Sequence, residues 1–420
     1  MKVLMIGHGC NPYAGSEPGL TWNWAFHMAA ANTVHLVSFP RHEREVERFL
    51  AQNPRPNLKL HWVRVEPRLD AWKPEEQTKV KLHYVRWTRR VRQYVHALHR
   101  IEKFDVVHHV GWGTVSVPSP FWRLRIPLIW GPLGGGQVCP QGLLAMFGAG
   151  SFWEVLRTLR VRALPLLPSF RAAAQKSFAV LATNRETQAV LRRAGASNVR
   201  LLMDSALPGD FIPQPMPRRT ATKTLNLIWA NRLVRWKGLD LAILALRQLV
   251  EGSGVRLVVA GGGRLQAEFT EKVRRLGLEK TIIIRGSVPW HDMAREFESA
   301  DALLLTSTRE SLGSVVLEAA SYALPYIALD LGGAATFFPP SAGIKIAPTT
   351  LQETATAIAQ AIVELRDHPE KRLEMGRCAY QFAKASTWDA HAQVMQQIYD
   401  DAAASSSRFR NVRLVAQPEV

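Results

Sequence analysis

The sequence predicts an α/β protein of two domains, each built on a doubly wound parallel sheet. Short apolar strands alternate with helical patterns along the chain, an order typical of parallel strands joined by helices. The alternation stops at a proline-rich stretch, "PGDFIPQPMPRRTATK" over 208–223, and then begins again. The 420 residues are enough for two hydrophobic cores of ordinary size. We therefore expect two similar domains with a ligand cleft between them.

The first expected domain covers residues 1–207. Short apolar runs bounded by turn residues predict its strands, which are "KVLMIG", "TVHLVSF", "LKLHWVRV", "DVVHHV", "PLIWGP", "SFAVLATN" and "NVRLLMDSA". Stretches with helical periodicity, such as "GLTWNWAFHMAA" and "VKLHYVRWTRRVRQYVHALHRI", lie between them. This order favours a Rossmann-like sheet covered by helices.

The second expected domain covers residues 224–385 and repeats the pattern after the linker at 208–223. Its strands are predicted at "LNLIWANR", "VRLVVAGGG", "TIIIRGS", "DALLLTS" and "PYIALD". A closing helix is expected over 386–404 and a disordered tail over 405–420. In doubly wound sheets ligands bind beyond the carboxyl ends of the strands, so the loops that follow the strands should carry the chemistry.

Positive charge is concentrated in the first half of the chain. The formal net charge is +18, and residues 1–210 hold 28 Lys and Arg residues against 14 Asp and Glu. Such an excess usually marks a polyanionic partner, which can be a nucleic acid, an anionic membrane surface or an acidic substrate. A hydrophobic content of 47% excludes a disordered chain.

Three scattered cysteines argue against a disulfide framework or a zinc site. Cys10, Cys139 and Cys378 are odd in number and lack C-x-x-C spacing, which favours a reducing compartment. The start of the chain, "MKVLMIGHGCNPYAG", has too few apolar residues for a signal-peptide core and predicts a strand entering a loop. No run approaches the ~18 apolar residues that span a bilayer. We expect a cytoplasmic protein.

Basic and glycine-rich turns follow the first two strands of the second domain. "NRLVRWKG" places Arg232 and Lys237 five residues apart, after a strand and before a helix. A solvated basic turn would explain them, but a guanidinium and an ammonium beside a helix N-terminus also suit a diphosphate. The next turn, "AGGGRL" with Gly261 to Gly263, allows close approach of a ligand, although a plain tight turn uses glycine equally well.

Two glutamates bracket the start of a predicted helix in "TSTRESLGSVVLEAASYALP", residues 306–325. Glu310 lies in the polar run after a strand, and Glu318 lies inside the apolar helical pattern. A partly solvated helix with an ordinary surface charge is one explanation. At 1.5 Å per residue the two positions are at most roughly 12 Å apart, about the span of a diphosphate with a sugar at each end. One carboxylate could accept hydrogen bonds from a ribose and the other from a hexose, which predicts a nucleotide-sugar site.

This arrangement resembles the donor site of retaining GT-B glycosyltransferases of family 4, the glycosyl transferases group 1. The similarity rests on Arg232, Lys237 and the E-x7-E from Glu310 to Glu318, and it extends over roughly residues 1–400. It implies two Rossmann-like, doubly wound parallel-sheet domains facing a cleft. Arg232 and Lys237 would bind the donor diphosphate, Glu310 the sugar hydroxyls and Glu318 the ribose.

Further donor contacts are implied by the same resemblance. Gly313 and the amides around it would approach the phosphates, and the loop "RGSVPW" would lie beside the base. The sequence departs from the family pattern at Leu312, where phenylalanine is frequent, and at Ala323, where glycine is usual. Neither departure removes a charged group. The implied donor-binding set is Gly15, Ser16, Gly262, Gly286, Val288, Leu312, Gly313 and Glu318.

The first domain would then bind the acceptor. "NPYAGSEPG" after the first strand contains Gly15, Ser16 and Glu17, which match a family loop that lies against the donor phosphates and the acceptor. A turn with an N-capping serine would have the same sequence pattern. A further glycine-rich loop, "WGPLGGGQ" with Gly135, follows a later strand and would lie on the acceptor side.

Two adjacent histidines end the strand in "FDVVHHVGWG". The resemblance implies a functional histidine here. Side chains alternate along a strand, so at most one of His108 and His109 can face the acceptor, and the other should be a packing residue. We expect His109 in the catalytic set and His108 on the acceptor side, although the pattern leaves open which of the two faces the cleft.

The resemblance implies retention of the anomeric configuration without a covalent enzyme intermediate. The expected catalytic set is Arg232, Lys237, Glu310 and His109, in which the two cations stabilise the leaving diphosphate. The chain contains no D-x-D motif, so we expect no metal, and no cofactor besides a nucleotide-sugar substrate such as a UDP- or GDP-sugar. The acceptor would be a glycan or a lipid-linked glycan in the synthesis of a cell-surface polysaccharide such as lipopolysaccharide or exopolysaccharide. A sugar-nucleotide epimerase or hydrolase of GT-B shape is the alternative.

Two stretches of the first half suggest a surface partner. The segment 81–100 combines Tyr84, Trp87 and Tyr94 with several arginines, and "LLAMFGAGSFWEVLRTLRVRALPLLPSF" also interleaves aromatic residues with arginines. Such stretches serve membranes or nucleic acids, or simply fold into the domain. No base-reading module accompanies them. We expect the first domain to dock on an anionic membrane, at the inner face of the plasma membrane, and we expect no nucleic-acid partner.

Overall fold

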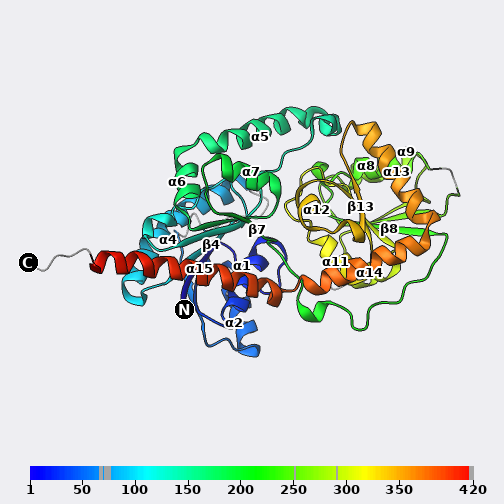
Figure 1. Ribbon diagram of the computed structural model, residues 1–420. Coiled ribbons are helices and arrows are strands. Elements are labelled where there is room, and N and C mark those ends of the chain that lie inside the picture. Colours follow the sequence, from blue (N-terminus) through cyan, green and yellow to red (C-terminus); the bar gives the residue numbers. More distant parts are fainter. Residues whose placement is uncertain (66–69, 71–76, 250–251, 290–291, 416–420) are drawn as a thin grey trace, which may run out of the picture. The chain divides into compact units, whose positions relative to one another are not determined.

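The protein folds into two compact units, each with its own parallel sheet. The structure is a computed structural model (Figure 1) that describes residues 1–65, 70, 77–249, 252–289 and 292–415. Unit 1 comprises residues 1–136, 162–204 and 388 onward, and unit 2 comprises residues 137–161 and 205–387.

The sheet of unit 1 has seven strands, and all neighbours are parallel. The strands are β1 Lys2–Gly7, β2 Thr33–Ser38, β3 Leu58–Trp62, β4 Val106–Gly111, β5 Leu128–Leu133, β6 Ala179–Ala182 and β7 Val199–Leu201. Their order in the sheet is β3-β2-β1-β4-β5-β6-β7. Successive strands are added toward one edge up to β3, and from β4 on they are added toward the other edge, so the switch point lies between β1 and β4. The central strands β1 and β4 are buried along almost their whole length because both faces of the sheet are covered. The predicted doubly wound sheet is confirmed.

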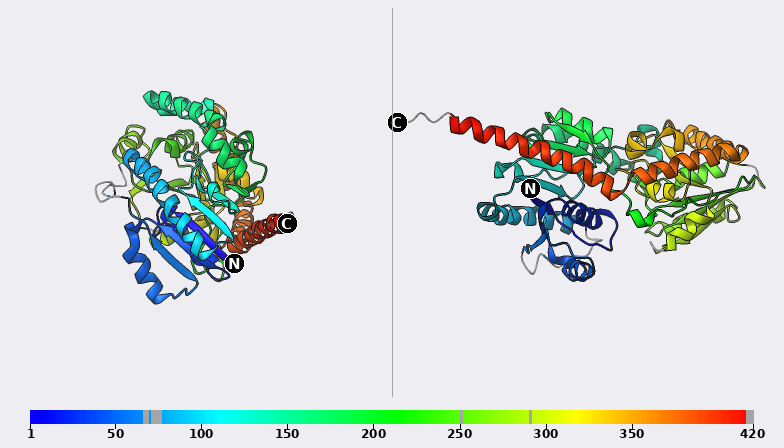
Figure 2. Two further views of the ribbon diagram at one scale, coloured as in Figure 1. Left: turned by 90° about the vertical axis from the view of Figure 1, so that its left-hand side faces the viewer. Right: turned by 60° about the horizontal axis from the view of Figure 1, so that its bottom comes forward.

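Helices join these strands. They are α1 Ser16–Met28, α2 Glu43–Gln52, α4 Gln77–Glu102, α6 Pro168–Lys176, α7 Arg185–Arg193 and α15 Trp388–Val415. The last of them, drawn in red in Figure 2, packs on α1, where the rings of Trp24 and Trp388 lie 5.3 Å apart. The closing helix thus belongs to unit 1 rather than to the second domain. It also extends beyond the predicted 386–404 to Val415, into the range expected to be a tail.

The basic helix α4 uses its aromatic residues for the core. Tyr84 and Trp87 are buried, and the indole of Trp87 donates a hydrogen bond to the carbonyl of Val63 at 2.9 Å. The expectation that these two rings face a partner is corrected here, because the hydrophobic stripe of α4 packs onto the sheet. Within the described residues, every helix is too short or too polar to cross a bilayer. The exposed side of α4 carries Arg86, Arg89 and Arg90.

The sheet of unit 2 has six parallel strands in the order β10-β9-β8-β11-β12-β13. They are β8 Leu225–Ala230, β9 Val255–Ala260, β10 Ile282–Gly286, β11 Ala302–Leu305, β12 Tyr326–Leu329 and β13 Gly343–Ile346. The helices are α8 Leu239–Leu246, α9 Gln266–Arg275, α10 Met293–Ser299, α11 Val315–Ser321, α12 Gly332–Phe337, α13 Leu351–Asp367 and α14 Pro369–Ala385. The order reverses between β8 and β11, so this is a second doubly wound sheet, as predicted.

A segment between β5 and α6 packs with unit 2 although its neighbours in the sequence belong to unit 1. It contains the 3-10 helix η3 Gln141–Gly150 and most of the helix α5 Ser151–Ala163. Leu143 and Met146 are buried in the same hydrophobic cluster as Leu227 of β8 and Ile358 of α13. A contiguous first domain over 1–207 therefore does not describe the packing of this segment.

Candidate functional site

Two adjacent strands of unit 2, β8 and β11, end at the point where the strand order reverses. Ligands of doubly wound sheets bind at such switch points, beyond the carboxyl ends of the strands. The loop 231–238 follows β8 and the loop 306–314 follows β11, and together they carry most of the charged residues that the sequence singled out.

The basic turn after β8 holds three cations in different environments. Lys237 forms an ion pair with Glu310 of the neighbouring loop, and the two side chains are only 13% and 16% exposed. Arg232 is exposed and has no ion pair or side-chain hydrogen bond within the described residues. Arg235 is tied instead to Asp240 of α8 at 3.0 Å. Lys237 and Arg232 are therefore the cations available to an anionic ligand, while Arg235 stabilises the turn.

Buried hydrogen bonds fasten the two loops to each other. The indole of Trp229 donates to the hydroxyl of Thr306 at 2.9 Å, and this hydroxyl donates to the carbonyl of Lys237 at 3.2 Å. The amide of Thr308 donates to the carbonyl of Trp236 at 2.9 Å. Because these bonds involve the backbone of both loops, they hold together the two main-chain segments from which Lys237 and Glu310 extend.

Gly313 lies directly beside Glu310. Its φ of +83° lies in the left-handed region, and a Cβ there would approach Cγ of Glu310 to 3.2 Å. Leu312 is buried, at 2% exposure, and anchors the turn in the core. Leu312 stands where phenylalanine is frequent in the family that the sequence resembles, and it keeps an apolar anchor at this position. The helix α11, which carries Glu318, begins two residues after Gly313.

Glu318 lies on α11 with little polar support. Burial raises the pKa of its carboxyl group from 4.5 to about 7. Within the described residues its side chain has no ion pair or hydrogen bond that would favour the charged form. A ribose whose hydroxyls donate to the carboxylate would supply that support, so this glutamate suits the role that the sequence predicted for it.

Replacing Glu318 by glutamine should stabilise the fold at pH 8 by about 1–2 kcal/mol and leave it unchanged at pH 4. The folded carboxyl group has the higher pKa, so its contribution is fully present below pH 4.5 and is lost as the pH rises through about 7. Urea unfolding of wild type and Glu318→Gln at both pH values measures the difference. Glu279→Gln, at an exposed position, is the control, and an equal effect of Glu318→Gln at pH 4 and pH 8 would contradict the burial argument.

The segment before α6 supports the loop that carries Glu310. The amide group of Gln137 donates to the hydroxyl of Ser311 at 3.0 Å. The guanidinium Nε of Arg309 lies 3.0 Å from Oε1 of the buried Glu154, and Arg309 also lies over the ring of Trp236 at 4.6 Å. Glu154 was missed in the sequence, although it is the only acid in the helix "SFWEVLRTLRVRA" and this could have indicated a specific partner.

The predicted base-side residues lie on the neighbouring strand ends of unit 2. Gly262 follows β9, and Gly286 ends β10 with Val288 two residues later. The amide of Gly261 donates to the carbonyl of Gly286 at 2.7 Å, which joins the two loops. These residues are thus assembled at the same edge of the sheet as the loops after β8 and β11, and a role in donor binding stays a prediction.

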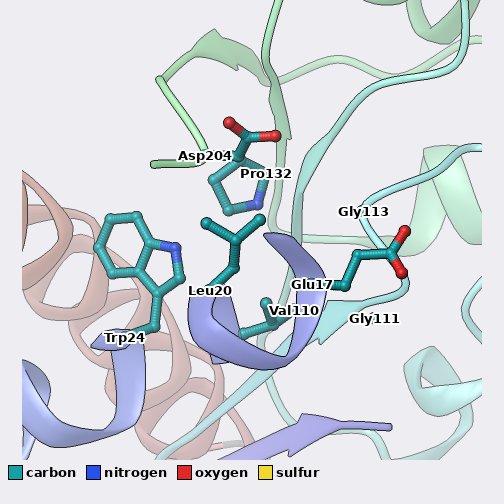
Figure 3. A pocket seen from close by; sticks show the side chains of 8 residues that line it. All are labelled: Glu17, Leu20, Trp24, Val110, Gly111, Gly113, Pro132 and Asp204. Carbon is teal, nitrogen blue, oxygen red and sulfur yellow. The ribbon is translucent and has the colours of Figure 1, made fainter. Parts of the chain in front are cut away.

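The residues expected on the acceptor side gather at the switch point of unit 1. Glu17 of α1, the loop after β4 and Asp204 line a small cavity (Figure 3) whose other walls include Trp24 and Pro132. Its volume of about 10 Å³ is room for one water molecule and excludes a sugar. The acceptor role of Glu17 and the donor-binding roles of Gly15 and Ser16 stay predictions.

Gly135 brings two loops of unit 1 together. A Cβ at this position would lie 2.6 Å from the hydroxyl oxygen of Thr114, and Gly134 pairs with Thr114 in an isolated bridge. The loop after β5 therefore packs tightly on the loop after β4, next to the histidine pair.

The two histidines of β4 point to opposite faces of the sheet. The ring nitrogens of His108 lie 2.7 Å from the hydroxyl of Tyr399 and 2.7 Å from the carbonyl of Gly131. His109 contacts the hydroxyl of Tyr84 at 3.2 Å through Nε2, and its buried Nδ1 has no hydrogen-bond partner among the residues that the structure describes. Burial lowers the pKa of His108 to about 4 and that of His109 to about 3, so both are neutral at pH 7.

His108 is thus the packing histidine, with both ring nitrogens occupied. His109 keeps a ring nitrogen without a partner in the described part of the chain, but the residue is only 1% exposed, so an acceptor would reach it only after movement of its neighbours. The catalytic role expected of His109 stays a prediction.

Comparison with known proteins extends the similarity beyond the charged motif. Residues 216–382 match the family Glycosyl transferases group 1. A D-inositol 3-phosphate glycosyltransferase of Corynebacterium aurimucosum is 28% identical over 187 residues, which are 43% of this chain and 44% of that protein. The match therefore covers less than half the length of this relative.

Solved structures of glycosyltransferases resemble the whole chain. Sucrose-phosphate synthase from Thermosynechococcus elongatus has a TM-score of 0.68 at 19% identity, covering 96% of this chain and 100% of that one. Anabaena HepE in complex with UDP-glucose has a TM-score of 0.59 at 16% identity, covering 96% and 100% of the two chains. The fold is that of the GT-B glycosyltransferases, as the sequence predicted.

Proposed function

We propose that this protein is a retaining glycosyltransferase of family 4 that moves a sugar from a nucleotide-diphosphate sugar to a glycan or lipid-linked acceptor. One observation carries the proposal. Lys237, Glu310 and the exposed Arg232 lie on two hydrogen-bonded loops at the switch point of a doubly wound sheet, inside the segment that matches the family. A lone surface ion pair would not need this backbone support.

The proposed donor site divides the charges between two tasks. Lys237 and Arg232 bind the diphosphate and stabilise the negative charge that develops on it when the glycosidic bond breaks. Glu310 accepts hydrogen bonds from the transferred sugar and also keeps Lys237 in place before the donor binds. Glu318 accepts from the ribose. The acceptor attacks on the face that the diphosphate leaves, which gives retention without a covalent intermediate.

Donor and acceptor classes rest on chemistry and on relatives. The UDP-glucose bound to Anabaena HepE supports a UDP-sugar, with a GDP-sugar as the alternative. The inositol phosphate in the name of the Corynebacterium relative supports a polar, phosphate-bearing acceptor, which agrees with the positive charge of this chain. We place the reaction in cell-surface polysaccharide synthesis, at the cytoplasmic face of the plasma membrane.

Two experiments test the proposal. The first is calorimetric titration with UDP, GDP and ADP, and the second is incubation with the matching sugar nucleotides and candidate acceptors. We expect micromolar binding of one nucleotide and a product whose anomeric configuration, measured by NMR, equals that of the donor. Release of free sugar or of an epimer at the same rate with and without acceptor would replace transfer by hydrolysis or epimerisation. Absence of nucleotide binding would contradict the donor site.

Transfer should be unchanged by EDTA. The physical reason is that Lys237 and Arg232 supply the positive charge that a D-x-D-bound cation supplies elsewhere, and the sequence has no D-x-D. Initial rates measured with excess EDTA and with added Mg²⁺ or Mn²⁺ check this. A large loss on chelation that Mg²⁺ or Mn²⁺ restores would contradict metal independence.

A further inference from the structure

The helix α5 exposes an apolar stripe, whereas a glutamate and an arginine lie on its inward side. The inward positions include Glu154, which is 4% exposed, and Arg157, whose guanidinium donates to the carbonyl of Gln137 at 2.9 Å. The outward positions are 67%, 68%, 42%, 46% and 55% exposed, in the order Phe152, Trp153, Val155, Leu156 and Leu159. An ordinary surface helix has the opposite orientation.

These five side chains form one continuous stripe, which we call the α5 outer face. At 100° per residue they occupy an arc of about 160° on the helix, with no polar residue at its centre. Arg160 and Arg162 are exposed and lie near the two borders of the stripe. The rings of Phe152 and Trp153 contact each other with their centroids 5.5 Å apart, so the aromatic end is packed rather than scattered.

The inner face explains why α5 keeps this orientation. Glu154 lies 3.0 Å from the guanidinium of Arg309, the residue before Glu310, and also 3.8 Å from Arg157. Turning the helix to bury its apolar stripe would place this carboxylate in solvent and remove the support from Arg309. The outer face therefore contributes nothing to the core of unit 2, and a contiguous exposed apolar surface of this kind indicates a binding surface.

We propose that the α5 outer face docks the protein on an anionic membrane by inserting into the interfacial region of the bilayer. Thirteen residues are too few to span, and the pattern of a Trp- and Leu-bearing stripe bordered by arginines is that of a helix lying in the plane of the interface. The arginines at the borders would reach the phosphate groups while their stems cover apolar surface. The net charge of +18 adds attraction to anionic lipid.

Charge favours lipid over a second copy of this chain as the occupant. Two copies meeting through the α5 outer face would bring Arg160 and Arg162 of each toward those of the other, whereas lipid phosphates neutralise them. Of the two stretches that the sequence singled out for a surface partner, the structure favours the second, which contains α5, because Tyr84 and Trp87 of α4 are buried. The proposal does not depend on the glycosyltransferase assignment, because it concerns a surface outside the donor site.

Flotation of the full chain with lipid vesicles tests the proposal. Wild type should float with vesicles of phosphatidylcholine and phosphatidylglycerol, less with phosphatidylcholine alone, and less at high salt. Trp153→Ser with Leu156→Ser should weaken vesicle binding about tenfold or more, since binding scales with buried apolar area. Ile101→Ser and Val394→Ser, at 77% and 51% exposed positions on other helices, are matched controls and should bind like wild type.

Nucleotide binding by calorimetry separates docking from the donor site. The double variant should bind UDP as wild type does, which also verifies its fold. Each of the following four results would overturn the proposal. Wild type could remain unbound at low salt, the double variant could float as well as wild type, or sedimentation could reveal a dimer that the double variant dissociates, which would assign the face to a second copy. Loss of flotation only on Arg86→Glu, Arg89→Glu and Arg90→Glu would move the docking surface to α4.

Discussion

Alanine at Lys237 or at Glu310 should lower kcat for sugar transfer by about 10²–10³-fold without unfolding the protein. Lys237 supplies preorganised positive charge at the leaving diphosphate, and Glu310 both positions that ammonium and binds the sugar. Because the two side chains are largely shielded from solvent, their charges act with little screening. Each variant should also bind the nucleotide-sugar less tightly, and Lys237→Ala should lose more affinity for the nucleotide diphosphate alone.

An ion pair of the same chemistry provides the control. Lys371 of α14 and Glu364 of α13 pair at 2.5 Å on the surface of unit 2, away from the strand ends. Lys371→Ala and Glu364→Ala should leave kcat within about twofold of wild type. Circular dichroism and thermal unfolding verify the fold of all four variants. Near-normal transfer by both Lys237→Ala and Glu310→Ala would remove the donor site from these loops.

Gly238→Ala should destabilise the protein by about 2–5 kcal/mol and abolish nucleotide binding. Gly238 has φ +75°, and a Cβ there would overlap the carbonyl oxygen of Thr306. An alanine must therefore adopt the left-handed region and also push the loops after β8 and β11 apart. Since those loops hold Lys237 and Glu310, the same displacement separates the two charged groups.

Gly277→Ala separates the two contributions to the effect of Gly238→Ala, which are the left-handed backbone strain and the steric overlap of the added Cβ. Gly277 has φ +67°, but nothing lies within 4 Å of a Cβ built on it. It should show only the left-handed strain, about 1–2 kcal/mol, with nucleotide binding unchanged. Urea unfolding and calorimetry measure both properties. Equal destabilisation of the two alanine variants would mean that the contact of Gly238 with Thr306 is not needed to hold the loops together.

The donor-site residues could be predicted because they are local to strand ends. A strand followed by "NRLVRWKG" and another followed by "STRESLG" place their charged groups at one edge of any parallel sheet. What the sequence did not supply was the pairing of Lys237 with Glu310, since it depends on β8 and β11 being neighbours. Two complete strand–helix units separate β8 from β11 in the sequence, and no local pattern predicts that these two strands lie side by side.

For the histidine pair of β4, the sequence predicted one property but not the other. Alternation along β4 predicted that His108 and His109 face opposite ways, and the structure agrees. Which of them is the packing residue was decided by Tyr399, a residue of the last helix, more than 290 positions away. A short-range pattern cannot contain that information.

The sequence by itself determined the α/β alternation, the two parallel sheets and the clustering of cations and carboxylates at strand ends, because hydrophobic periodicity and turn residues act over a few positions. It missed the short edge strand β13 and the full length of α15. Only the tertiary structure decided that residues 137–161 pack with unit 2, that the rings of α4 are buried, and that α5 presents its apolar side outward. A helix with one apolar and one charged side can be oriented either way. The partner that satisfies its charges, here Arg309 for Glu154, selects the orientation, and that partner lies 155 positions along the chain.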